Sequence, residues 1–160
     1  MNAFPLSQVL IITTHLESVG RLSQMIEKSF RFKVGTLEAD KLGKKTTTET
    51  PDIILVDVTS VGVNEIDIVN EVLAQFVDIP VIVVSDALDP VQVRQLFKLK
   101  IHDWLSKPVE EAGILSVLQS ALRTSKFSGN RVHAVISAVG GAGATTLAVS
   151  MADLLAKGPL

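Results

Sequence analysis

Two uninterrupted runs of apolar residues constrain the fold of this chain most strongly. Ile53–Val56 and Val81–Val84 contain only valine, isoleucine and leucine, and they have the length of strands rather than of helices. A half-buried strand alternates polar and apolar residues, so a run without alternation indicates a strand that is buried on both faces. Such strands are typical of parallel sheets covered by helices on both sides. At 160 residues, 47% of them hydrophobic, the chain is long enough to bury one such sheet.

Strand-like and helix-like segments alternate along the first 125 residues, which is the pattern of consecutive βα units. Apolar residues at spacings of three and four predict helices within 16–30, 66–76, 89–100 and 114–122. Residues 39–50 lack a clear apolar stripe, and we expect a short helix or a mobile loop there. The pattern therefore predicts an α/β fold with a doubly wound, five-stranded parallel sheet. Its expected strands are Val9–Thr13, Phe32–Leu37, Ile53–Asp57, Pro80–Ser85 and Asp103–Leu105.

The bulk composition argues against several classes of partner and site. The chain contains no cysteine, so disulfides and thiolate metal sites are excluded. Its net charge is −2, from 15 basic and 17 acidic residues, which offers nucleic acid no broad positive surface. No apolar run approaches the roughly 20 residues that span a bilayer, and the N-terminus lacks the blocks of a secretory signal. We expect a cytoplasmic protein with no transmembrane segment and no nucleic-acid partner.

Polar residues follow the expected strands at the edge where parallel sheets bind ligands. Thr13 and Thr14 follow the first strand and Asp57 ends the third. Ser85 ends the fourth strand, and Lys107 follows the fifth. We expect the strand order 2-1-3-4-5, in which these strand ends meet in one crevice at the topological switch point. Each residue also has a purely structural interpretation, as a turn or helix cap or as a neighbour's counter-charge.

The order and spacing of these residues resemble the receiver domain of two-component response regulators, over roughly residues 7–125. The resemblance implies a flavodoxin-like, CheY-like fold in an atypical receiver domain that spans residues 1–125. It implies that Asp57 occupies the phosphoacceptor position and that Ser85 is the hydroxyl that binds the phosphoryl group. Lys107, in the pair Lys107-Pro108, would be the cation that contacts this group. Trp104 falls where receivers carry an aromatic switch residue.

The acidic pair that receivers place after the first strand is absent. It holds the divalent cation needed to phosphorylate the aspartate, and here Thr13 and Thr14 replace it. Only Asp57 and backbone carbonyls such as that of Thr59 remain as ligands, so we expect weak Mg²⁺ binding at most. We therefore predict a role that is independent of phosphorylation and without enzymatic activity. The alternative is an active response regulator that is phosphorylated on Asp57.

A glycine-rich segment near the end of the chain has the pattern of a phosphate-binding loop, between a strand-like run at 132–137 and a helical pattern. Glycines allow backbone N–H groups to face a phosphate, but Ala144 stands where lysine would contact it. The segment resembles the loop of ParA/MinD-type ATPases, and this resemblance implies a lysine at the position of Val139 as well. We expect residues 132–160 to begin a truncated ParA/MinD-like P-loop domain, joined through a linker at 126–131. The alternative is a tight strand-to-helix turn. No cofactor is expected in this chain, and ATP is expected, if at all, only in the complete protein. The loop consists of Gly140, Gly141, Gly143, Ala144, Thr145 and Thr146.

A receiver-like domain followed by a degenerate ParA/MinD-like loop resembles the CpaE/TadZ group of pilus-assembly proteins. This resemblance implies an interaction and localisation module in tad-type pilus assembly or secretion, recruited by its protein partners to a cell pole. We also expect a homodimer through the face formed by residues 91–100, Trp104 and residues 114–122, a region that receivers often use for dimerisation. A nucleotide-switched ATPase is a further interpretation that concerns only the complete protein.

Overall fold

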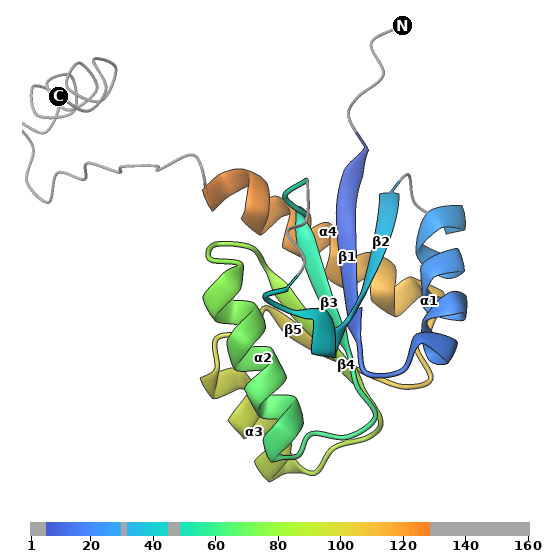
Figure 1. Ribbon diagram of the computed structural model, residues 1–160. Helices are drawn as coiled ribbons and strands as arrows, with labels where there is room; N and C mark the ends of the chain where they lie inside the picture. Colours follow the sequence, from blue (N-terminus) through green and yellow to red (C-terminus); the bar gives the residue numbers. More distant parts are fainter. Residues whose placement is uncertain (1–5, 30–31, 45–48, 129–160) are drawn as a thin grey trace, which may run out of the picture. The chain divides into compact units, whose positions relative to one another are not determined.

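The computed structural model describes residues 6–29, 32–44 and 49–128, which form a five-stranded sheet with helices on both faces. All neighbouring strands are parallel, and they follow one another across the sheet in the order β2-β1-β3-β4-β5 (Figure 1). The predicted fold class and strand order are confirmed. The strands are β1 (Ser7–Thr13), β2 (Phe32–Glu38), β3 (Ile53–Asp57), β4 (Val81–Ser85) and β5 (Asp103–Ser106).

Four α-helices connect the described strands or follow them: α1 (Leu16–Ser29), α2 (Val63–Gln75), α3 (Pro90–Lys98) and α4 (Glu111–Ser128). Within the segment where we expected a short helix or a loop, a single 3-10 turn, η1, covers Ala39–Lys41. Helix α4 includes residues 126–128, which the sequence assigns to a linker. The rest of that linker and the glycine-rich segment lie outside the described residues.

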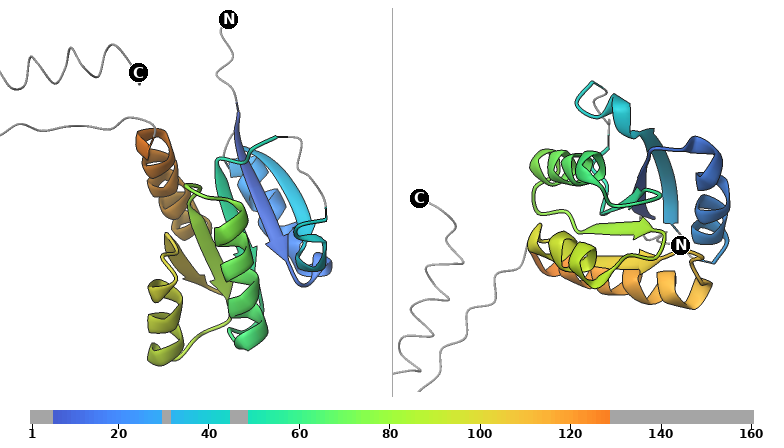
Figure 2. Two further views of the ribbon diagram at one scale, coloured as in Figure 1. Left: turned by 60° about the vertical axis from the view of Figure 1, so that its left-hand side comes forward. Right: turned by 90° about the horizontal axis from the view of Figure 1, so that it is seen from below.

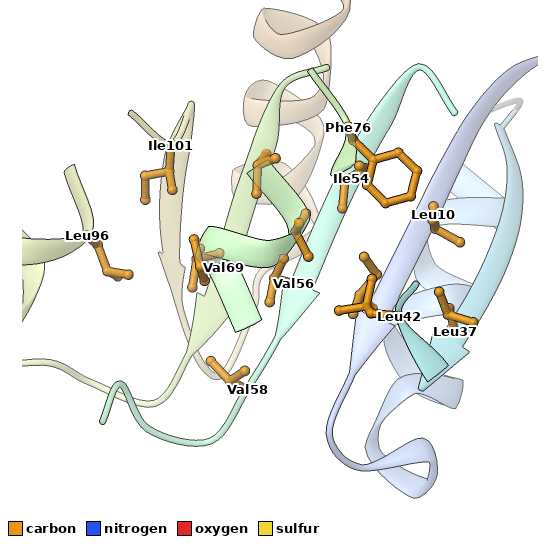
Figure 3. Packing of buried hydrophobic residues seen from close by; sticks show 14 of the residues in the cluster. Leu10, Leu37, Leu42, Ile54, Val56, Val58, Val69, Phe76, Leu96 and Ile101 are labelled. Carbon is orange, nitrogen blue, oxygen red and sulfur yellow. The ribbon is translucent and has the colours of Figure 1, made fainter. Parts of the chain in front are cut away.

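The side chains of the sheet enter two separate cores, because neighbouring residues of a strand point to opposite faces. Leu10 and Ile12 of β1 pack in the core beneath α2 and α3, whereas Val9 and Ile11 pack beneath α1 and α4. Figure 2 shows the two layers of helices from further angles, and Figure 3 shows the core beneath α2 and α3 from close by. Every residue of β3 and β4 is buried, as their unbroken apolar runs predict.

Helix α3 begins where the sequence predicts it. The Asp89 side chain accepts a hydrogen bond from the Gln92 backbone N–H at 2.8 Å. The Gln92 side chain in turn accepts one from the Asp89 backbone N–H at 3.1 Å, which completes a capping box. Pro90 occupies the first turn, where its missing N–H costs no hydrogen bond. Only four residues separate the end of β4 at Ser85 from the start of α3 at Pro90.

The strand register brings the expected site residues to one edge of the sheet. Thr13 of β1 is aligned with Asp57 of β3 on one side and with Glu38 of β2 on the other. Asp57 is aligned with Val84, one residue before Ser85. Strands β1, β3 and β4 therefore end at similar heights. Their carboxyl ends open into a common crevice, as expected for this topology.

Candidate functional site

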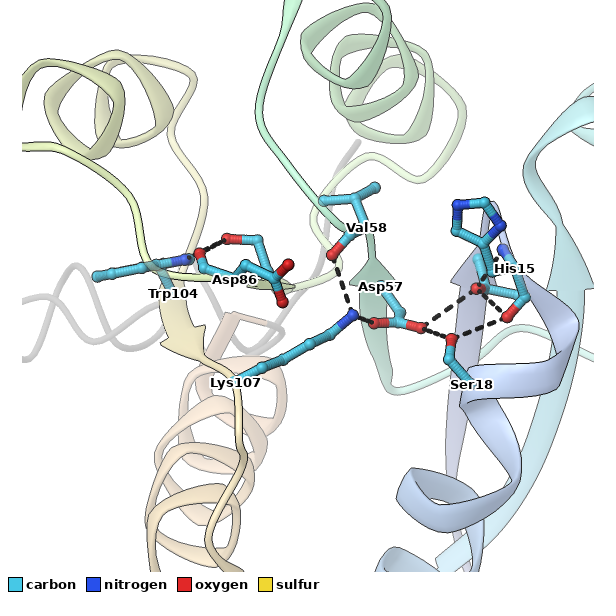
Figure 4. Close-up of polar contacts among 9 residues, drawn as sticks. His15, Ser18, Asp57, Val58, Asp86, Trp104 and Lys107 are labelled. Atoms are coloured by element: carbon cyan, nitrogen blue, oxygen red, sulfur yellow. Dashed lines mark hydrogen bonds and ion pairs between the residues drawn. The ribbon is translucent and has the colours of Figure 1, made fainter.

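Asp57 is the centre of a network of polar contacts at the carboxyl end of β3. Its side chain is only 3% exposed. One carboxylate oxygen, Oδ2, lies 3.2 Å from the hydroxyl of Thr13 and 2.9 Å from the hydroxyl of Ser18. The other oxygen, Oδ1, lies 2.8 Å from the ammonium of Lys107. Figure 4 shows Ser18 and Lys107 approaching Asp57 from opposite sides.

The two hydroxyl groups at Asp57 Oδ2 have a second acceptor within reach. The hydroxyls of Thr13 and Ser18 also lie 3.1 Å and 2.9 Å from the backbone carbonyl of His15. A hydroxyl donates one hydrogen, and a carboxylate is a stronger acceptor than a neutral carbonyl. The negative charge of Asp57 therefore favours donation to Oδ2. The start of α1 is tied in this way to the end of β3.

Lys107 is held by two contacts besides its ion pair. Its ammonium donates a hydrogen bond to the backbone carbonyl of Val58 at 3.1 Å, and its backbone N–H donates to the carbonyl of Ser85 at 2.8 Å. Asp57 Oδ1 accepts no hydrogen bond of good geometry from the described residues. The contact at Oδ1 is thus mainly one of opposite charges. Since the Lys107 side chain is 28% exposed, its charge neutralises Asp57 without being fully removed from water.

Ser85 and Trp104 form a second cluster beside the first. The indole N–H of Trp104 donates to the Ser85 hydroxyl at 2.9 Å, and this hydroxyl donates to the backbone carbonyl of Asp86 at 2.9 Å. Ser85 is completely buried. Its single hydrogen is therefore directed to Asp86, and no hydrogen bond joins it to Asp57 in the described part of the chain.

The remaining residues predicted for the crevice lie at its rim. Thr14 is exposed, and its backbone N–H donates to the backbone carbonyl of Asp57 at 3.4 Å. The backbone carbonyl of Thr59, a candidate metal ligand, accepts a hydrogen bond from the backbone N–H of Asp86 at 3.0 Å. Pro108 is exposed and follows a cis peptide bond. The residues predicted for the degenerate phosphate loop fall outside the described residues.

Ser18 is the member of the network that the sequence did not indicate. It lies in the first turn of α1, where serine is common for reasons of local hydrogen bonding. Its contact with Asp57 depends on the rotation of α1 over the sheet, which no short motif encodes. His15, which directly precedes α1, has an exposed side chain, and its contacts in the network are made by its backbone.

The residues around Asp57 do not fit a bound Mg²⁺ ion. Within residues 6–29, 32–44 and 49–128, no group of three or more histidine, cysteine, aspartate or glutamate side chains is placed to hold a metal. Mg²⁺ requires an octahedral shell of oxygen ligands and is usually bound through carboxylates. Here Asp57 faces two hydroxyl donors and an ammonium. These donors occupy the carboxylate that a cation would need.

Comparison with known proteins connects this architecture to a family. The family model of the response regulator receiver domain matches residues 9–119. A curated protein from Halalkalibacterium halodurans, named as the C4-dicarboxylate response regulator DctR, is 30% identical over 108 residues, which are 65% of this chain. The match covers 46% of that protein, so the chain spans about half the length of this relative.

Two solved structures show the same fold at low sequence identity. One is a pilus assembly protein (cpaE) from Burkholderia thailandensis, with a TM-score of 0.67 and 14% identity, covering 74% of this chain and 99% of that one. Another is the chemotaxis protein CheY4 from Vibrio cholerae, with a TM-score of 0.63 and 19% identity, covering 73% of this chain and 99% of that one. No helix of the described residues is both long and apolar enough to span a membrane.

Proposed function

The chain belongs to the response regulator receiver domain family, and we propose that it acts there as a protein-docking module that works without phosphorylation of Asp57. Receiver domains are signalling modules that act through protein partners rather than as enzymes. We propose no enzymatic activity for this chain. Its function then lies in the surface that its fold presents and in the partners that this surface binds.

The observation that carries this proposal is the set of donors around Asp57. Thr13 and Ser18 contact one oxygen and Lys107 contacts the other. Phosphoryl transfer to an aspartate needs a divalent cation to offset the charge of the incoming group. Two hydroxyl groups and one ammonium can stabilise a carboxylate, but they bring a single positive charge to the site where a divalent cation brings two. Asp57 is therefore a structural partner of α1 and of the segment after β5.

The Ser85 and Trp104 cluster supports the same interpretation. In a working switch, the hydroxyl at this position would turn toward the acceptor aspartate. Here the Ser85 hydroxyl is held between the Trp104 indole and the Asp86 carbonyl. Reorientation toward Asp57 would cost both hydrogen bonds in a buried environment, where unsatisfied groups are expensive.

An active response regulator is the second candidate, because Asp57, Ser85 and Lys107 all lie at the same edge of the sheet. Incubation with acetyl phosphate and Mg²⁺, followed by intact-mass analysis, separates the two functions. We expect no phosphoryl adduct on the folded protein, while a reactive receiver treated in parallel gains one. An adduct that forms on this chain and is lost in Asp57→Asn would establish the second candidate instead.

We propose that the docking face includes α3 and that its occupant is a second copy of the chain. Two large apolar side chains on α3, Val91 and Phe97, are 65% and 46% exposed. Burying them against another molecule would remove apolar area from water. The expected face also includes Trp104, which is half-buried next to α3.

Sedimentation velocity tests this docking face. We expect the chain to dimerise, and Val91→Glu to shift it toward the monomer. Val77→Glu is the matched control, because Val77 is 69% exposed but follows the carboxyl end of α2. Acetyl phosphate with Mg²⁺ should leave the distribution unchanged. A chain that is monomeric at all concentrations, or that dimerises only with the phosphodonor, would contradict the proposal.

We further propose that the assembly served by this module is a pilus or secretion apparatus, and that it is recruited from the cytoplasm to a cell pole through its partners. Support comes from the domain order expected from the sequence and from the fold shared with the cpaE pilus assembly protein. This role would not require the Mg²⁺ that ordinary receivers need, and any ATP binding would belong to the complete protein.

A fluorescent fusion of the complete protein tests recruitment to the pole. We expect a focus at one pole that Asp57→Asn leaves in place. A focus lost in Asp57→Asn would contradict a phosphorylation-independent role.

A further inference from the structure

A cavity of about 180 Å³ opens next to Asp57, between α1 and the segment that follows β5. Part of its wall is apolar and is formed by Leu22 and Met25 on α1 and by Val84 and Val109. A cavity of this size holds several water molecules and therefore has room for a small organic molecule.

The charges around the cavity favour an anion. Asp57 and Lys107 line it and neutralise each other. Arg21 also lines it, and within the described part of the chain this guanidinium forms no hydrogen bond or ion pair. The three charged groups together leave one positive charge. The apolar wall strengthens the attraction between this positive charge and an anion, because the electric field of the charge is screened less there than in open water.

Lys107 can provide a second contact without releasing Asp57. An ammonium carries three N–H donors. One is used by the Val58 carbonyl and a second faces Asp57 Oδ1. The third remains for a group in the cavity, which Lys107 lines. An anion between Lys107 and Arg21 would therefore add a contact to the network rather than break it.

We infer that this cavity is a binding site for a small organic carboxylate, whose charged group lies between Arg21 and Lys107 and whose short apolar chain packs against Leu22 and Met25. Charge-assisted hydrogen bonds from two cations fix the carboxylate. The apolar wall selects a ligand with a hydrocarbon portion over a bare inorganic anion. This inference goes beyond the docking function, because it gives the crevice an input other than phosphorylation.

Methionine methyl signals offer a direct test in the full chain. The chain has three methionines, and Met25 lines the cavity. With methyl-¹³C methionine, the Met25 signal is assigned from its loss in Met25→Leu. Isovalerate is the probe, isovaleramide is its neutral isostere, and inorganic phosphate is the anion without an apolar part. We expect a saturable shift of the Met25 signal with isovalerate, at a Kd on the order of 1 mM, and no saturable shift with the other two.

Variants at Arg21 separate the proposed contact from general charge effects. Arg21→Gln should weaken isovalerate binding about tenfold, as expected for loss of a charge-assisted hydrogen bond. Arg94→Gln is the control, since Arg94 is exposed on α3, and it should bind as the original chain does. Equal shifts with isovaleramide, unchanged binding by Arg21→Gln, or no saturable shift with isovalerate would each overturn the assignment. Binding of phosphate without isovalerate would overturn it as well.

Discussion

Replacement of Lys107 by methionine tests the structural role of Asp57, because it removes the charge that faces Oδ1 and keeps a side chain of similar length. Asp57 would remain buried in the crevice, and among the described residues only the hydroxyls of Thr13 and Ser18 would remain as partners of its side chain. A buried carboxylate without its counter-charge is costly even when hydroxyl groups donate to it. The Val58 carbonyl would lose its donor at the same time.

The size of the expected stability loss follows from the burial of the ion pair between Lys107 and Asp57. Removing one partner of a buried ion pair costs about 3–5 kcal/mol. Lys107 is 28% exposed, so water screens the pair in part and the cost falls toward the lower limit. We expect Lys107→Met to lower the free energy of unfolding by about 3 kcal/mol, measured by urea denaturation and far-ultraviolet circular dichroism. A loss below about 1 kcal/mol, the usual range of surface pairs, would show that Lys107 does not stabilise a buried charge on Asp57.

Two further variants identify the cause of the loss. Lys107→Met combined with Asp57→Asn should recover much of the stability, because the neutral amide needs no counter-charge. Lys33→Met is the matched control at an exposed pair, since Lys33 and Glu49 are both more than half exposed, and it should change stability little. If the double variant is as unstable as Lys107→Met alone, the loss comes from packing rather than from the charge of Asp57.

Two other predictions concern neighbouring contacts. Ser18→Ala removes a hydroxyl 2.9 Å from Asp57 Oδ2 and should lower the free energy of unfolding by about 1–2 kcal/mol, measured by the same urea assay. An unchanged midpoint would show that this hydroxyl contributes no net stability. At the other end of the sheet, hydrogen bonds from Lys33 and Gln8 hold the pKa of Glu49 below its usual range. A lowered pKa means that the stabilisation is present above the ordinary glutamate pKa and is lost as the pH falls through the lowered value. Carboxyl ¹³C titration should therefore show the pKa of Glu49 rising in Lys33→Met, and no rise would contradict this cause.

The fold was predictable because its strongest signals are local. The unbroken apolar runs at Ile53–Val56 and Val81–Val84 require burial on both faces, and a parallel sheet provides this. The start of α3 was likewise encoded by Asp89 and Pro90 in consecutive positions. The end of α4 was not predictable from the sequence. Serine and lysine, as at Ser125 and Lys126, are common in linkers, but helices tolerate them as well.

The site was predictable only in part, because its contacts depend on orientation. The strand ends identified the edge of the sheet where Asp57, Ser85 and Lys107 lie. Sequence spacing did not show that Ser85 is bound to Trp104 rather than directed toward Asp57. It also did not show Ser18 at Asp57, since that contact crosses 39 positions of the chain. Contacts of this kind are fixed by how the helices pack against the sheet, and this packing depends on all the side chains of the core.

An Mg²⁺ titration observed by ¹H–¹⁵N spectroscopy tests most directly whether the chain's own donors replace a metal at Asp57. The original chain is compared with Thr13→Asp/Thr14→Asp, which restores two acids at the end of β1. We predict no saturable shift of the Asp57 and Thr14 amide signals in the original chain at millimolar Mg²⁺, and saturable shifts in the variant. Saturable shifts in the original chain that disappear in Asp57→Asn would show that Asp57 binds the cation and that the donors around it do not replace a metal.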